Sequence, residues 1–272
     1  MHANLFDRYH HTEGPLHRLE ARVKVVLTVA FIVSNALLPD GAWTAFGLGW
    51  LLVLAANALS LLGLGFTLKR SLIALPFALA AISSIFSTPG NPLSSFPFLG
   101  MELIVTDAGL LRFASILVRS WLSVQAAILL VAVTTFPDLI HALEHLRAPK
   151  IITTVIAFLY RYLFVLSDEV IRLLRARQAR SATLPPSVSP HFPRKWGERK
   201  RGVVWRAKVA GNMVGQLFLR SYERSDRIYN AMLARGYQGQ IRTLHPHTLT
   251  RRDWTIGALT VLLILSLQLI GR

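Results

Sequence analysis

Residues 25–68 read VVLTVAFIVSNALLPDGAWTAFGLGWLLVLAANALSLLGLGFTL, and Asp40 is the one ionisable side chain among them. Three further runs, Ser71–Met101, Ser120–Phe136 and Trp254–Gly271, contain no ionisable residue at all. A helix of about 20 mostly apolar residues can cross the hydrocarbon core of a membrane. The sequence therefore predicts an all-α polytopic membrane protein.

The composition of the whole chain agrees with a membrane location. Of its 272 residues, 53% are hydrophobic and 16% are charged, whereas about 25% are charged in a typical soluble domain. Cysteine is absent, which excludes a disulfide framework and a thiolate metal site. The first 22 residues are polar, so no cleaved secretory signal is expected. These features fit a multi-pass protein of the inner (cytoplasmic) membrane.

Four membrane-spanning helices are expected in residues 23–136, after a polar N-terminal arm of residues 1–22. Their approximate bounds are 23–38, 42–66, 71–87 and 108–136. A short basic loop at Lys69-Arg70 joins the second helix to the third. Residues 88–107 hold three prolines, two acids and no Lys or Arg, so this loop is expected outside the cell.

Residues 137–252 are predicted to form a separate cytoplasmic module. It begins with a short helix at 137–146, and two long helices follow at about 149–180 and 199–235, joined by a proline-containing linker. The last domain, residues 253–272, is one C-terminal transmembrane helix.

The distribution of positive charge places this module. Residues 170–252 hold 18 Lys and Arg against three acids. If the apolar stretch Ile151–Ser167 does not cross the membrane, 27 of the 30 basic residues lie on the side of the N-terminus. Positive residues collect on the cytoplasmic side, so Ile151–Ser167 is predicted to be an amphipathic helix at the membrane surface. The net charge of +16 is thereby explained by the number of positive residues on the cytoplasmic side of the membrane.

A membrane-anchored nucleic-acid binder, with salt-sensitive DNA binding, is a third-ranked alternative.

Two short triplets lie at the expected ends of the long helices: Ala179-Arg180-Ser181 and Ala234-Arg235-Gly236. Either one alone is ordinary helix-stop chemistry, with Arg in the last turn and a small residue after it. Two such triplets in one module suggest docking contacts, because a guanidinium stays charged and can grip carboxylates or helix-end carbonyls.

Two further features are predicted to make helix contacts. Ala207, Gly211 and Gly215 are spaced by four and form a smooth stripe, where the long helix 149–180 is expected to cross closely. Arg119 lies deep in the fourth span and is expected to meet a neighbouring helix or a partner subunit.

The sequence contains only weak matches to the motifs of enzymes. His141, Glu144 and His145 match the inverted zinc-protease pattern H-x-x-E-H, but no third ligand is obvious, so a protease is a remote alternative. His10, His11 and His17 could bind a metal but more simply belong to a polar arm. No phosphate-binding G-x-x-x-x-G-K-[ST] loop occurs, so the chain is not expected to hydrolyse ATP itself.

Four stretches together resemble the transmembrane T component of energy-coupling factor (ECF) transporters, and within it the cobalt-type CbiQ proteins. They are Asp7–Lys24, Thr134–Pro149, Arg161–Ser181 and Arg224–Gly239. The last stretch, with Ala231-Met232-Leu233-Ala234-Arg235-Gly236-Tyr237, is the most specific. Ser181 stands where Gly is common in the family.

The resemblance implies a non-catalytic subunit that joins two CbiO-like ABC-type ATPases to a substrate-binding membrane subunit. Each Ala-Arg-small triplet would dock into one ATPase, and ATP with Mg would be bound there, so this chain would hold no cofactor and no metal. The cargo would be cobalt, bound by a CbiM-like subunit with a small CbiN-like subunit. Arg119 would be a candidate contact with the substrate-binding subunit. Partners would also include lipid but no nucleic acid. A T component for nickel, or for a vitamin such as biotin, is the runner-up.

Overall fold

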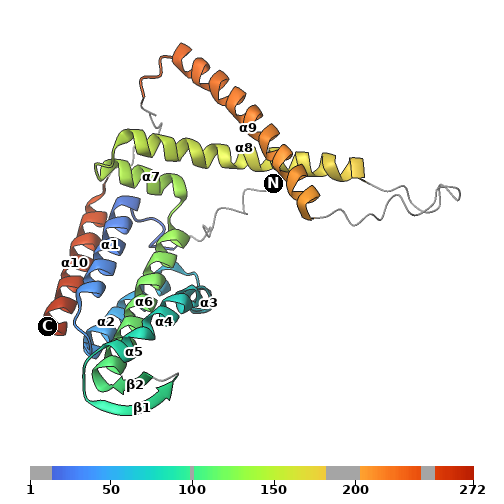
Figure 1. The fold of residues 1–272 in the computed structure, drawn as a ribbon. Helices are drawn as coiled ribbons and strands as arrows, with labels where there is room; N and C mark the ends of the chain where they lie inside the picture. The colour runs from blue at the N-terminus through green and yellow to red at the C-terminus, as the bar shows by residue number, and fades with distance from the viewer. Residues whose placement is uncertain (1–13, 99–100, 182–202, 240–248) are drawn as a thin grey trace. The chain divides into compact units, whose positions relative to one another are not determined.

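The computed structural model of the chain describes residues 14–98, 101–181, 203–239 and 249–272 (Figure 1). It has two compact units. Among the described residues, the membrane unit comprises 14–98, 101–148 and 249–272, and the helix-pair unit comprises 149–181 and 203–239.

The described part of the membrane unit is helical apart from one hairpin. Its helices are α1 (Ala21–Leu37), α2 (Trp43–Ser60), α3 (Leu64–Ser71), the 3-10 helix η2 (Leu72–Ala74), α4 (Leu75–Ala81), α5 (Ser83–Ser87), α6 (Asp107–Val133), α7 (Phe136–His145) and α10 (Arg251–Gly271).

The core of this unit lies where α1, α2, α6 and α10 meet. Phe31, Phe46, Leu122 and Ile264 come one from each of these helices, and all four side chains are buried in one cluster. The final helix of the chain therefore packs into the same bundle as the first.

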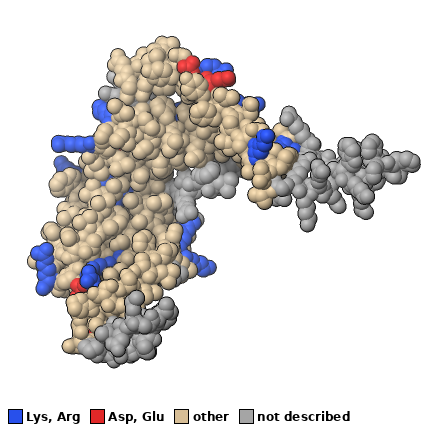
Figure 2. Space-filling view, in the orientation of Figure 1, with Lys and Arg blue, Asp and Glu red and all other residues tan. Residues whose placement is uncertain are grey.

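The outer surface of the bundle is apolar. Val33, Leu51, Leu265 and Leu269 are large hydrophobic side chains that stay exposed. Figure 2 shows that uncharged side chains cover most of the visible face over these helices. An exposed apolar surface of this extent fits contact with lipid rather than with water.

The polytopic helical class is confirmed. α2, α6 and α10 are long and apolar enough to cross a membrane, and the bent pair Gly65–Ala74 and Leu79–Ser87 forms a further candidate span. α1, with 17 residues, is slightly shorter than these but packs in the same core. α8 of the helix-pair unit is also long and apolar enough, so its predicted place outside the membrane rests on the charge distribution alone.

The third predicted span is broken in the structure. α2 stops at Ser60, because Leu61 takes a left-handed conformation with φ 57°. α3 follows and carries Lys69 and Arg70 in its last turn, where the sequence predicts a loop. Basic side chains at a helix C-terminus are favoured by the helix dipole. The segment then bends by 46° instead of continuing as one helix over 71–87.

The loop predicted at 88–107 contains a β-hairpin. β1 (Pro92–Phe98) pairs antiparallel with β2 (Met101–Thr106), from Pro92 opposite Thr106 to Phe98 opposite Met101. Both strands of this two-stranded sheet are edges, where prolines are tolerated because an edge leaves half of the backbone groups unpaired.

α7 belongs to the membrane unit, although the sequence predicts the module boundary before it. Ile140 and Ala142 of α7 are buried, and Ala142 packs in a small cluster with Ala21 and Val25 of α1. The boundary between the two units therefore falls at Pro149 rather than at Pro137.

A buried polar cluster joins α1, α6 and α10 at one end of the bundle. Lys24 Nζ donates to the Val133 carbonyl at the end of α6, at 3.2 Å. Asp253 and Thr250 form a capping box that starts α10, and the backbone N–H of Glu20 donates to Asp253 Oδ1 at 3.4 Å. Side chains in this cluster thus satisfy a backbone carbonyl at the end of α6, the backbone N–H of Glu20 just before α1, and the first turn of α10.

The helix-pair unit is built from α8 (Lys150–Ser181) and α9 (Val203–Ala234), each of 32 residues. At a rise of 1.5 Å per residue each is about 48 Å long. Figure 1 shows α9 crossing α8.

Candidate functional site

The two Ala-Arg-small triplets lie at the C-terminal ends of the two long helices, as the sequence predicts. Ala179-Arg180-Ser181 forms the last residues of α8. α9 ends at Ala234, so that Arg235 and Gly236 form the turn that follows it. The Arg235 side chain is exposed.

The end of α9 is a complete Schellman motif. The Tyr237 N–H donates to the Met232 carbonyl at 3.0 Å, and the Gly236 N–H donates to the Leu233 carbonyl at 2.9 Å. Gly236 has φ +80°, a left-handed conformation that the motif requires and that glycine adopts without steric strain. This turn fixes where Arg235 leaves the helix.

Gly236→Ala should therefore weaken the end of α9. A Cβ at this left-handed position costs about 1–2 kcal/mol, and the loss falls on the turn that carries Arg235. The matched control is Gly215→Ala, inside α9, where alanine favours the helix. In purified protein, amide hydrogen exchange at residues 232–237 should be faster in the first variant and unchanged in the second. Equal exchange in both variants would contradict this role of the turn.

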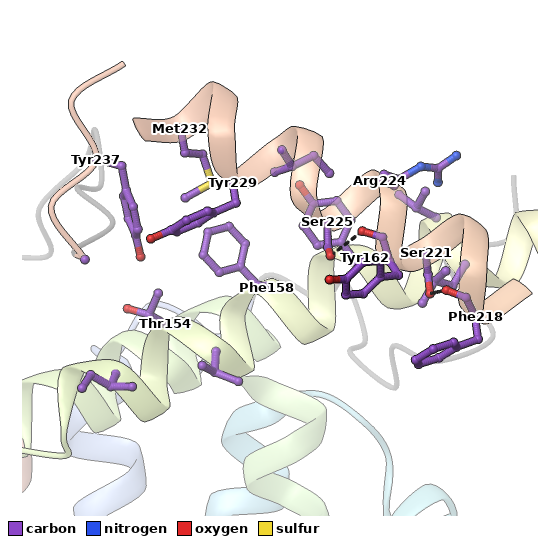
Figure 3. Close-up of a pocket in the computed structure, with 17 residues that line it drawn as sticks. Thr154, Phe158, Tyr162, Phe218, Ser221, Arg224, Ser225, Tyr229, Met232 and Tyr237 are labelled. Carbon is purple, nitrogen blue, oxygen red and sulfur yellow. Dashed lines mark hydrogen bonds between the residues drawn. The ribbon is translucent and has the colours of Figure 1, made fainter. Parts of the chain in front are cut away.

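The two helices run antiparallel across each other and leave two grooves. The first, here called the apolar groove, has a volume of about 620 Å³. It lies between residues 151–166 of α8 and residues 218–239, which begin in α9. In Figure 3 the rings of Phe158, Tyr229 and Tyr237 gather at one end of it.

The second, here called the polar groove, has a volume of about 730 Å³ and lies between residues 169–177 of α8 and 205–220 of α9. Three arginines line it, together with one acid, Glu169. They are Arg172, Arg177 and Arg220. Because each groove pairs one end of α8 with the opposite end of α9, the two triplets lie at opposite ends of the helix pair.

The small-residue stripe does not make the contact that the sequence predicts. Ala207, Gly211 and Gly215 are exposed. Among the described residues no atom lies within 4 Å of a Cβ added at Gly211 or Gly215. The helices instead meet through larger side chains, including an ion pair between Glu169 and Arg220 at 2.6 Å.

Arg119 finds its partner within this chain. Its Nη2 donates to the Leu38 carbonyl at 2.6 Å and to Asp40 Oδ1 at 2.8 Å. The guanidinium also lies 5.7 Å from the centre of the Phe46 ring. Of the two predicted partners, the structure supports a neighbouring helix, because Arg119 joins α6 to the end of α1 and the turn after it. A contact between Arg119 and a substrate-binding subunit stays a prediction.

The inverted protease pattern does not form a metal site in the described residues. His141 Nδ1 lies 3.9 Å from Glu144 Oε2, and both side chains are partly exposed on α7. The part of the chain that the structure describes holds no group of three or more His, Cys, Asp or Glu that could bind a metal. His10 and His11 lie outside the described residues.

Comparisons with known proteins agree with the architecture. The family model CbiQ, described as a cobalt transport protein, matches residues 12–246. An uncharacterized protein of Methanocaldococcus jannaschii is 27% identical over 98% of this chain and 86% of its own length.

Two similar proteins are named energy-coupling factor transporter transmembrane protein EcfT. That of Lacticaseibacillus paracasei is 27% identical and covers 97% of this chain and 98% of its own length. That of Exiguobacterium sibiricum is 30% identical and covers 94% of this chain and 93% of its own length.

Proposed function

Because this chain belongs to the CbiQ family of cobalt transport proteins, we propose that it is the energy-coupling transmembrane subunit of an ATP-driven importer. Its similarity to proteins named EcfT supports the role of a transmembrane component in an energy-coupling factor transporter. In this role the chain is a membrane protein without catalysis of its own. It binds no cofactor, and ATP with Mg is bound by its partners.

The observation that carries the proposal is the placement of the two triplets. Arg180 and Arg235 lie at opposite ends of one antiparallel helix pair. Two ATPases, one docked at each end, would move the helix pair when they close on ATP. Arginine suits such a contact because its planar fork forms two hydrogen bonds at once and keeps its charge.

The exposed apolar side chains of the helix pair support a second contact, with a membrane-embedded subunit. Ile151, Val155, Leu159, Phe218 and Tyr222 are all more than half exposed. All of these except Leu159 line the apolar groove, and a large exposed apolar patch marks an interaction site for protein or lipid. The substrate-binding subunit would then be reshaped when the helix pair moves.

The proposed substrate is the cobalt ion, received from a CbiM-like subunit that acts with a small CbiN-like subunit, and the proposed ATPases are CbiO-like. Nickel or a vitamin such as biotin is the alternative cargo. The N-terminus and the helix-pair unit are proposed to lie in the cytoplasm, since most Lys and Arg residues are there in that orientation.

Uptake of radioactive cobalt by intact cells tests this substrate. Cells without this chain should take up far less cobalt, and a plasmid copy should restore uptake. Excess unlabelled nickel should compete weakly if the cargo is cobalt. Unchanged cobalt uptake without the chain, together with lost biotin or nickel uptake, would refute cobalt as the cargo.

Glu144→Gln should leave uptake unchanged. The Glu144 side chain is partly exposed, and its Oε2 lies 3.9 Å from His141 Nδ1. An ion pair at such an exposed site contributes little to stability. A metalloprotease would lose its general base in this variant and with it all activity. Cobalt uptake and cleavage of casein by the purified protein, measured side by side, separate the two functions. Casein cleavage by the wild-type protein that disappears in this variant would contradict a transporter subunit without catalysis of its own.

A further inference from the structure

Glu169 is a buried carboxylate at the contact between α8 and α9. The residue is 8% exposed. Its Oε2 accepts a hydrogen bond from Arg172 Nη2, one turn further along α8. Its Oε1 accepts a hydrogen bond of 2.6 Å from Arg220 Nη1 on α9. The Glu169–Arg220 pair thus joins residues 51 positions apart in the sequence.

The electrostatics keep this carboxylate charged. The hydrogen bond from Arg220 lowers the pKa of Glu169, and the nearby charges of Arg172 and Arg224 lower that pKa further, against the opposing effect of burial. Glu169 lies beyond the apolar stretch Ile151–Ser167 and, among the described residues that line the polar groove, is the only acid. Removing it would leave several arginines close together without their counter-charge, which is unfavourable.

The pair lies where the two grooves meet. The polar groove begins at Glu169 on α8 and ends at Arg220 on α9, and the apolar groove lies before Glu169 along α8 and begins at Phe218 on α9, next to Arg220. From Glu169 to Arg180 is about 16 Å along α8, and from Arg220 to Arg235 is about 22 Å, taking 1.5 Å per residue. The pair therefore lies between the two docking ends.

We propose that the Glu169–Arg220 ion pair is the fixed point of the crossing, a positioning contact about which α8 and α9 rotate so that their two docking ends move together. This inference rests on the proposed function. It assigns to one charge pair the role that the sequence suggests for Ala207, Gly211 and Gly215, which are exposed instead.

Distances between spin labels in the assembled complex test the rotation. The chain has no cysteine, so introduced pairs are labelled cleanly. Ala176→Cys with Asn212→Cys reports on the polar groove, and Val155→Cys with Tyr229→Cys on the apolar groove. Rotation about a point between the grooves lengthens or shortens both distances together. The protein is measured with its ATPases, without nucleotide and with a non-hydrolysable ATP analogue.

Correlated changes of both distances support the proposal. A change of the distance across one groove alone, or changes of opposite sign in the two grooves, overturns the proposal. Apart from the labelled cysteines, this test leaves the chain unaltered. If no ATPase is bound to the wild-type chain, the proposed function itself fails, which is a distinguishable result.

Glu169→Gln, Arg220→Met and the double variant test the pair itself. Each single variant should keep its bound ATPases and their ATP hydrolysis but lose uptake about tenfold, as is typical when two sites are uncoupled. The double variant should lose no more than either single one, because both remove the same contact. Asp168→Asn and Arg227→Met, at exposed neighbouring positions, are the controls and should transport normally. Additive losses, or equal losses in the controls, overturn the role of the pair.

Discussion

Reversing both arginines, as Arg180→Glu with Arg235→Glu, should abolish uptake and release the ATPases from the purified complex. Each reversal replaces a cation that grips carboxylates or carbonyl oxygens by an anion that repels them. If two docking sites hold the same assembly, as proposed, loss of one converts a bivalent contact into a monovalent one. Each single variant should thus bind the ATPases about a hundredfold less tightly but still detectably, and the double variant should not bind them.

The matched control reverses two arginines away from the helix ends. Arg175 and Arg227 are exposed, lie one in each long helix and give the same total charge change when both become Glu. This control should keep the ATPases and transport normally. If it loses the ATPases as fully as the Arg180/Arg235 variant, net charge rather than docking at the ends explains the loss.

Arg119→Ala should destabilise the membrane unit. The Arg119 guanidinium donates to the Leu38 carbonyl and pairs with Asp40 at 2.8 Å, so that its loss leaves a carbonyl uncapped and a carboxylate without its cation. Hydrogen bonds to charged groups contribute about 1.5–3 kcal/mol each, and leaving a partner unsatisfied adds a desolvation penalty. Solvent screens the pair with Asp40, because that side chain is 38% exposed. The expected loss is therefore reduced to about 2 kcal/mol, measured as a lower melting temperature in detergent.

Arg112→Ala is the control for this prediction. Arg112 lies two turns earlier on α6 and is exposed, so its removal should leave the melting temperature unchanged. If Arg119→Ala keeps the wild-type melting temperature but loses the substrate-binding subunit, Arg119 is a subunit contact after all, and the intramolecular role is refuted.

Much of the membrane unit follows directly from the sequence. The uncharged runs locate α2, α6 and α10, because a long stretch without charge can be stable only in lipid or in a large core. The Arg119–Asp40 pair could also have been predicted. Asp40 is the one ionisable residue in 25–68, and a buried cation in a membrane requires an anion or a carbonyl nearby.

Other features depend on packing that no local pattern encodes. The bend between α3 and α5 lies inside an uncharged run, where composition is the same for one straight helix and for two short ones. Glycines in α9 suggested a close helix contact, but Gly211 and Gly215 face open space among the described residues. The contact between the two helices instead includes the ion pair of Glu169 with Arg220. Residues 170–252 hold 18 basic residues, and nothing in the sequence indicates which of them pairs with Glu169.

The most direct test of the central claim identifies what binds this chain. The affinity-tagged protein is extracted from its native membrane in mild detergent, and the bound proteins are identified by mass spectrometry. The account predicts stoichiometric ABC-type ATPases together with a substrate-binding membrane protein. Purification of the inserted, folded chain without any ATPase would contradict it.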